Sequence, residues 1–140
     1  MAKIYKRSDR IKIKIDEVVV TIAPLSVHQK TEAEALMSVG RQKRDVHMIT
    51  KGLILILRYA VKDISGLENP DGSPYKLNFE NDLLSEECVD DIFNIQLHSK
   101  LIMVCSNLVG SIPTQFTDQD GKPIEGVEYV SSSKEASDPK

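Results

Sequence analysis

The chain has 140 residues, which suits one domain with a modest core rather than several domains. Aromatic residues make up only 5% of it and Trp is absent, so the core must be mainly aliphatic. The basic start is followed by no apolar signal region, and no stretch is long enough for a transmembrane helix. These features argue against a secreted or membrane-spanning protein.

The charge is unevenly distributed along the chain. Residues 1–62 carry 13 Lys/Arg and 6 Asp/Glu (13 − 6 = +7), and residues 63–140 carry 5 and 15 (5 − 15 = −10), which together give −3. Such polarity can reflect pairing of the two halves within one monomer. It also suits head-to-tail association, in which the positive face of one copy meets the negative face of the next.

Two strands are expected near the N-terminus. Residues 11–15 alternate Ile and Lys, the period of a half-buried strand, and the β-branched run 18–22 follows after two residues. This spacing predicts a β-hairpin, although Asp16-Glu17 is not a favoured turn pair and leaves the turn geometry open. Pro24 should end the second strand because it cannot donate a ladder hydrogen bond.

A first helix is expected over residues 27–39, with Ser26 as its N-cap and Gly40 as its stop. Its apolar face is thin, so it should lie on the surface. The basic run Arg41-Gln42-Lys43-Arg44 follows it in the sequence.

A second helix is predicted over residues 46–62, with Asp45 as its cap, because the apolar positions keep helical spacing. This segment contains the densest apolar run of the chain, residues 52–61, which must be the centre of any core. The run 53–57 alone would also suit a central strand, and that alternative stays open.

The second half of the chain should contain a loop, a short strand and one long helix. Residues 68–74 are rich in turn formers, and 75–79 alternate as a short strand would. Ser85 should cap a helix whose apolar stripe runs to Gly110. Cys88 and Cys105 on that helix would lie about 25 Å apart, too far for a disulfide, which suits a reducing intracellular compartment.

Residues 111–140 change in composition. Turn chemistry at 117–123 suggests a short second hairpin between Phe116 and Tyr129, and residues 131–140 should form a flexible tail. The chain is therefore predicted to be α+β, with an N-terminal β-hairpin followed by three helices. Residues 1–10 are expected to be a basic N-terminal arm, 11–110 a single domain and 111–140 an extended C-terminal arm.

No catalytic or metal-binding pattern is evident. The three His residues are scattered, no Cys-x-x-Cys or His-x-x-x-His occurs, and the acidic start of the last helix is typical of dipole pairing in water. Neither a Gly-x-Ser-x-Gly elbow nor a Gly-rich phosphate loop is present. We therefore expect no enzymatic activity, no cofactor and no bound metal.

Two basic clusters are the candidate partner-binding residues. They consist of Lys6, Arg7 and Arg10 near the first strand and of Arg41, Lys43 and Arg44 between the first two helices. Basic patches can hold phosphates, but aromatic interleaving is nearly missing and the total charge is negative, which argues against nucleic acid. A bacterial nucleic-acid-binding module remains a third class, and it would lose its DNA as salt rises.

The order of elements resembles the tail assembly chaperones and related small tail-morphogenesis proteins of tailed bacteriophages. The matching segments are the hairpin closed by residues 22–26 with its following helix, the apolar run 53–61, the loop 69–74 and the helix start 84–87. The resemblance implies a small α+β or mostly α domain that binds other phage structural proteins, shielding the tape measure protein or delivering tail tube subunits.

Within phage biology the alternative is a permanent virion subunit of the tail, adaptor or baseplate, with terminal arms that contact neighbouring copies. The charge asymmetry suits this alternative because opposite faces can meet in a ring or stack. Either role places the protein in the cytoplasm of the host bacterium or in the virion.

Overall fold

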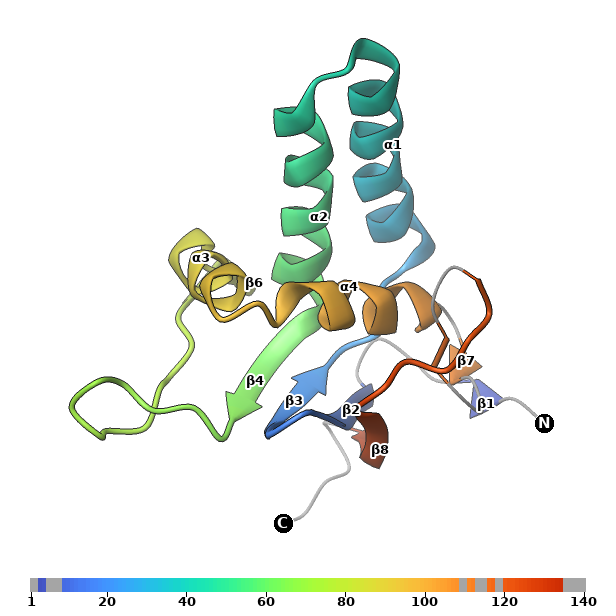
Figure 1. Cartoon of the computed structure of the whole chain (residues 1–140). Coiled ribbons are helices and arrows are strands. Elements are labelled where there is room, and N and C mark those ends of the chain that lie inside the picture. The colour runs from blue at the N-terminus through green and yellow to red at the C-terminus, as the bar shows by residue number, and fades with distance from the viewer. Residues whose placement is uncertain (1–2, 5–8, 109–110, 113–115, 118–119, 135–140) are drawn as a thin grey trace.

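The computed structural model describes residues 3–4, 9–108, 111–112, 116–117 and 120–134. Within them the α+β class is confirmed: a four-stranded sheet carries a layer of helices on one face (Figure 1). The sheet has the order β4-β3-β2-β8 with antiparallel neighbours throughout. Its strands are β2 (Asp9–Ile15), β3 (Val18–Ile22), β4 (Val61–Ser65) and β8 (Val127–Lys134).

The N-terminal hairpin is confirmed, with Ile11 opposite Ile22 and Ile15 opposite Val18. Alternation sets its two faces: Ile11, Ile13 and Ile15 are fully buried, and the intervening lysines are exposed. Asp16 takes a positive φ of 54° in the two-residue turn, and its backbone N–H donates to Gly126 at 2.8 Å. A contact from the far end of the chain therefore supports this turn.

Helices α1 (Val27–Lys43) and α2 (Val46–Ala60) form a hairpin that stands away from the sheet (Figure 1). Ser26 caps α1 in a capping box with Gln29, and Asp45 caps α2, as predicted. The predicted stop at Gly40 is wrong, because this glycine is buried inside α1, where a Cβ would lie 2.8 Å from Ile49 Cγ1. Gly40 allows close approach of the two helices.

Residues 53–57 are helical, which settles the alternative of a central strand. The helix ends at Ala60, and residues 61 and 62 already belong to the edge strand β4, which the sequence did not predict. The carbonyl of Ala60 accepts a hydrogen bond from Ala23 N–H at 2.8 Å, so the chain passes directly from α2 into pairing with β3.

The predicted last helix is divided into α3 (Glu86–Asn94) and α4 (His98–Asn107). Ser85 caps α3 as predicted, through a 3.2 Å hydrogen bond to Cys88 N–H. Between the helices Gln96 has a φ of 60°, and Leu97 N–H donates to Ile92 C=O, the hydrogen bonds of a Schellman ending. The predicted C-cap, Gly110, lies outside the described residues.

The break also removes the basis of the 25 Å separation estimated for Cys88 and Cys105, although both are free and buried. The two short helices pack against α2, and α4 runs across the sheet. The core thus joins the inward Ile and Val residues of the hairpin with Leu101, Val104 and Leu108.

The small pairings complete the fold. Loop 68–74 is confirmed as a turn closed by a bridge from Glu68 to Pro74. The strand predicted at 75–79 is reduced to β5 (Phe79–Glu80), which pairs with β6 (Leu83–Leu84). Strand β1 (Lys3–Ile4) pairs with β7 (Ser111–Ile112).

The C-terminal prediction needs correction. A short turn bridged by Thr117 and Pro123 is present, but Tyr129 belongs to β8. That strand continues through residues 131–134 beside β2, so this part of the expected arm is an edge strand of the main sheet. Residues 135–140 lie outside the described part of the chain.

Candidate functional site

The two predicted basic clusters do not come together. Arg41 and Lys43 end α1 and Arg44 follows it, all three exposed, at the tip of the helical hairpin. Arg10 is half-buried in β2, at the opposite end of the molecule (Figure 1). Lys6 and Arg7 lie outside the described residues. Of the two predicted clusters, the one at the hairpin tip is the one whose three members are all described and exposed.

The tip has a defined backbone. Arg44 adopts a left-handed conformation with φ 54°, and Asp45 N–H donates to Gly40 C=O at 2.7 Å, which makes a Schellman ending. Asp45 Oδ1 then accepts the N–H groups of His47 and Met48, at 3.0 and 3.4 Å. Both helix ends at the tip are thus satisfied, so its exposed side chains project from a fixed frame.

Val46 is the apolar member of the tip. It is the first residue of α2, and 71% of it is exposed, the largest value among the exposed large hydrophobic residues of the described chain. The exposed cations Arg41, Lys43 and Arg44 precede it in the sequence, and none of them forms an ion pair within the described residues. An exposed valine with cations nearby is suited to bind a pocket that has apolar walls and acidic residues at its edge.

Helix α2 is apolar around most of its circumference, as expected of a helix buried on several sides. One side lies against α1, where Gly52 permits contact with Ala33 and Met37. Helices α3 and α4 cover its C-terminal half only. Several apolar side chains of α2, among them Met48, Ile54 and Leu55, remain half-buried.

One such region is the hairpin stripe, formed by Leu36, Val39, Met48 and Leu55. Residues 32, 36, 39 and 43 share one face of α1 by spacing, and residues 48, 55 and 59 share one face of α2. The hydroxyl of Tyr59 donates to Glu32 Oε1 at 2.7 Å, which shows that the two faces turn the same way. This hydrogen bond raises the pKa of Tyr59. All four stripe residues are half-buried.

A second region is the corner pocket between α2 and α3, a cavity of about 350 Å³ lined by Thr50, Ile54, Asp90, Phe93 and Asn94. The Phe93 ring stacks on the His98 ring, with 4.2 Å between the centroids and 11° between the planes. That contact fixes the aromatic wall of the pocket. Asp90 is exposed at the rim, and Glu87 lies one turn earlier on the same face of α3.

Arg58 fixes α3 beside α2. Its Nε–H donates to Leu84 C=O at 2.7 Å, immediately before the Ser85 cap, and its Nη groups face Glu80 at 3.4 Å and Glu86 at 3.6 Å. The Arg58 side chain is only 17% exposed, so these contacts are partly shielded from water. Arg58 therefore holds together α2 and α3, the two helices that form the walls of the corner pocket.

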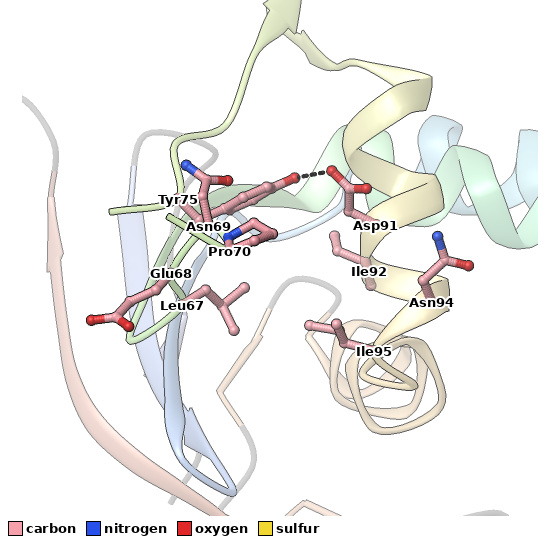
Figure 2. A pocket seen from close by; sticks show the side chains of 9 residues that line it. All are labelled: Leu67, Glu68, Asn69, Pro70, Tyr75, Asp91, Ile92, Asn94 and Ile95. Atoms are coloured by element: carbon pink, nitrogen blue, oxygen red, sulfur yellow. Dashed lines mark hydrogen bonds between the residues drawn. The ribbon is translucent and has the colours of Figure 1, made fainter. Parts of the chain in front are cut away.

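A third region is the loop groove of about 230 Å³ between the loop 67–75 and the end of α3 (Figure 2). Leu67, Pro70, Ile92 and Ile95 supply most of its apolar lining. Figure 2 shows the Tyr75 hydroxyl pointing to Asp91, and the distance to Oδ2 is 2.7 Å.

Burial raises the pKa of Tyr75 far above its ordinary value, and the hydrogen bond to Asp91 acts in the same direction. The hydroxyl is thus held as a donor in the loop groove. It anchors the loop to α3, which gives this hydrogen bond a structural role.

Among the residues that the structure describes, no three His, Cys, Asp or Glu side chains gather as metal ligands would. Burial raises the pKa of the Cys105 thiol to about 12, which suppresses the reactive thiolate. In the described chain no helix combines the length and apolarity needed to cross a bilayer.

Comparison with known proteins gives no match, since no family model fits the chain and no curated protein or solved structure is significantly similar. The candidate site therefore depends on the geometry of the chain itself. Sequence reasoning found the basic tip, but it missed the corner pocket, whose walls come from residues 40 positions apart. The only sequence feature that points to the exposure of Val46 is its position as the first helical residue after the N-cap Asp45.

Proposed function

We propose that this chain is a non-enzymatic phage morphogenesis protein that binds tail proteins, either the tape measure protein or tail tube subunits, during assembly. The observation that carries the proposal is the half-buried apolar stripe of the projecting α1–α2 hairpin. Helix α2 has more apolar circumference than its own chain buries, and such a surface is typical of a protein-binding element. The phage setting comes from the resemblance in element order.

The hairpin stripe is the part that the tail protein would cover. Its four half-buried side chains span two antiparallel helices, which gives a narrow apolar track about two turns long. A helix of the tail protein can lie along such a track with residues spaced by three and four positions.

The test is co-expression of this chain with candidate tape measure and tail tube proteins of tailed bacteriophages, followed by co-purification. Val39→Lys places a charge in the stripe and should abolish the complex. Ser38→Lys, one residue away and exposed, is the matched control and should leave it intact. The proposal would be refuted if no tail protein co-purifies with the chain, or if the Val39→Lys variant co-purifies as well as wild type does.

A permanent virion subunit is the second candidate function. The basic tip on one side of the molecule and the acidic start of α3 on another favour it, since opposite charges allow copies to join in a ring or stack. Detection of the chain in purified virions by mass spectrometry decides between the two candidates. A chaperone should be absent from finished particles, and a tail or baseplate subunit should be present.

A further inference from the structure

We propose that copies of this chain associate head to tail, with the hairpin tip of one copy seated in the corner pocket of the next. The occupant is a second copy, and its contacting segment is Val46 with its neighbours Arg41, Lys43 and Arg44. The contact concerns copies of the chain among themselves, so it does not depend on the function proposed above.

The tip supplies the projecting half of the contact. Val46 is 71% exposed, although valine is ordinarily buried, and it begins α2 just after the turn that joins the two helices at the end of the hairpin away from the sheet (Figure 1). The Schellman ending and the Asp45 cap hold the surrounding backbone. Little conformational entropy is lost when a segment of this kind docks, because its frame is already ordered.

The corner pocket supplies the receiving half. Its cavity of about 350 Å³ has more room than one valine side chain fills, and Ile54 and Phe93 provide apolar walls. Stacking on His98 keeps Phe93 in place, so the pocket exists before anything enters it. A hollow with apolar walls at Ile54 and Phe93 and polar residues around them can receive a small projecting hydrophobic side chain.

Charge complementarity indicates that the hairpin tip of a second copy binds in the corner pocket. Asp90 lines the pocket and Glu87 extends the same face of α3, whereas the tip carries Arg41, Lys43 and Arg44. Three exposed cations around the projecting valine would meet exposed carboxylates around the hollow. Pairing a tip with another tip, or a pocket with another pocket, would bring like charges together. The contact is therefore heterologous, and it leaves a free tip at one end of a pair and a free pocket at the other.

The test uses charge reversal on each half of the contact in the full-length chain. The tip variant carries Arg41→Glu and Arg44→Glu, and the pocket variant carries Glu87→Lys and Asp90→Lys. All four positions are exposed, so both variants should fold, which circular dichroism checks. Sedimentation velocity over a micromolar concentration series at low and high salt measures association.

Wild-type protein should associate as its concentration rises, and more weakly at high salt. Each variant alone should associate at least about tenfold more weakly, because its tip and its pocket then carry the same sign. An equimolar mixture of the two variants should recover association, since every tip then has a pocket of opposite sign. This recovery is specific to a contact between tip and pocket.

Matched controls place equal charge changes elsewhere. Lys12→Glu with Lys14→Glu, on the open face of the sheet, matches the tip variant in charge, and Glu125→Lys with Glu128→Lys matches the pocket variant. Both controls should associate like wild type. Val46→Ser should weaken association without any change of charge. A wild-type protein that stays monomeric throughout the series, or a mixture of the two charge-reversed variants that stays monomeric, would overturn the proposal.

Discussion

Gly52 of α2 lies directly against the backbone of Ala33 in α1. A Cβ at position 52 would be 2.6 Å from the Ala33 carbonyl oxygen and 2.5 Å from Met37 Cγ. The first of these neighbours is main chain and cannot swing away, so the glycine determines how closely the two helices of the projecting hairpin approach.

Gly52→Ala should therefore destabilise the protein, although alanine is the better helix former. Overpacking costs about 1–3 kcal/mol, and the gain in helix propensity of about 1 kcal/mol offsets part of it. Urea unfolding should give a net loss of free energy of unfolding. Lys51→Ala, at the exposed neighbouring position, is the control. A Gly52→Ala protein at least as stable as wild type would contradict the close approach.

Arg44 adopts a φ of 54°, a conformation that costs a residue with a Cβ about 1–2 kcal/mol. Arg44→Gly removes this cost and should raise the free energy of unfolding by up to about 1 kcal/mol after the greater chain entropy of glycine is counted. Arg44→Ala removes the same charge and keeps the strain, so it should not stabilise. Equal stability of the two variants in urea would show that the strain is absent.

Leu101 is fully buried in α4 against the sheet. Leu101→Asp should cost at least about 3 kcal/mol because it places a carboxylate in an aliphatic core and leaves a cavity. Ser99→Asp, exposed on the same helix, should change stability little. Thermal and urea unfolding measure both. A Leu101→Asp protein as stable as wild type would mean that α4 does not face the core.

Tyr75 should make stability fall at high pH. Its pKa is raised by burial and by the hydrogen bond to Asp91, so above the ordinary value of 10.0 the unfolded chain loses this proton and the folded chain keeps it. Folding then becomes less favourable as pH increases. The stability advantage of wild type over Tyr75→Phe should accordingly shrink as pH rises through 10. A stability advantage of wild type that does not change with pH would contradict the assignment.

The two cysteines should resist thiol reagents while the protein is folded. Both are buried, and burial raises the pKa of Cys105 to about 12, so thiolate is scarce at mildly alkaline pH. Native protein should react only as fast as it opens, and both thiols should react at once in urea. In the Cys105→Ser variant only Cys88 can react, so comparison with wild type gives the reaction rate of each thiol. Immediate reaction of the native protein would place a thiol at the surface.

Local chemistry made much of the first half of the fold predictable. Ser26 and Asp45 cap their helices as expected, and the Ile/Lys alternation of 11–15 set the inward face of the hairpin. Each depends on residues within a few positions of one another. The basic tip at 41–44 was found for the same reason, since a run of cations between two helices must lie at a turn.

The divided last helix shows how a local pattern can mislead. In a Schellman ending an apolar residue just beyond the helix contacts one in its last turn, and here these are Leu97 and Ile92. Leu97 also lies four residues after Phe93, the ordinary step of a helical stripe, so the break at Gln96 is hidden in the sequence. A glycine at that left-handed position would have revealed it.

The sequence by itself determined the α+β class, the caps, the hairpin and the position of the cations, because short-range hydrogen bonds and side-chain periodicity specify them. Only the tertiary structure decided that 61–65 and 127–134 become the edge strands of one sheet, and that α3 stands beside α2 to form the corner pocket. Those features arise from pairing between distant segments. Each strand supplies half of the hydrogen bonds of its pair, and each helix supplies one wall of the corner pocket. Neither segment alone has a sequence pattern that identifies its partner.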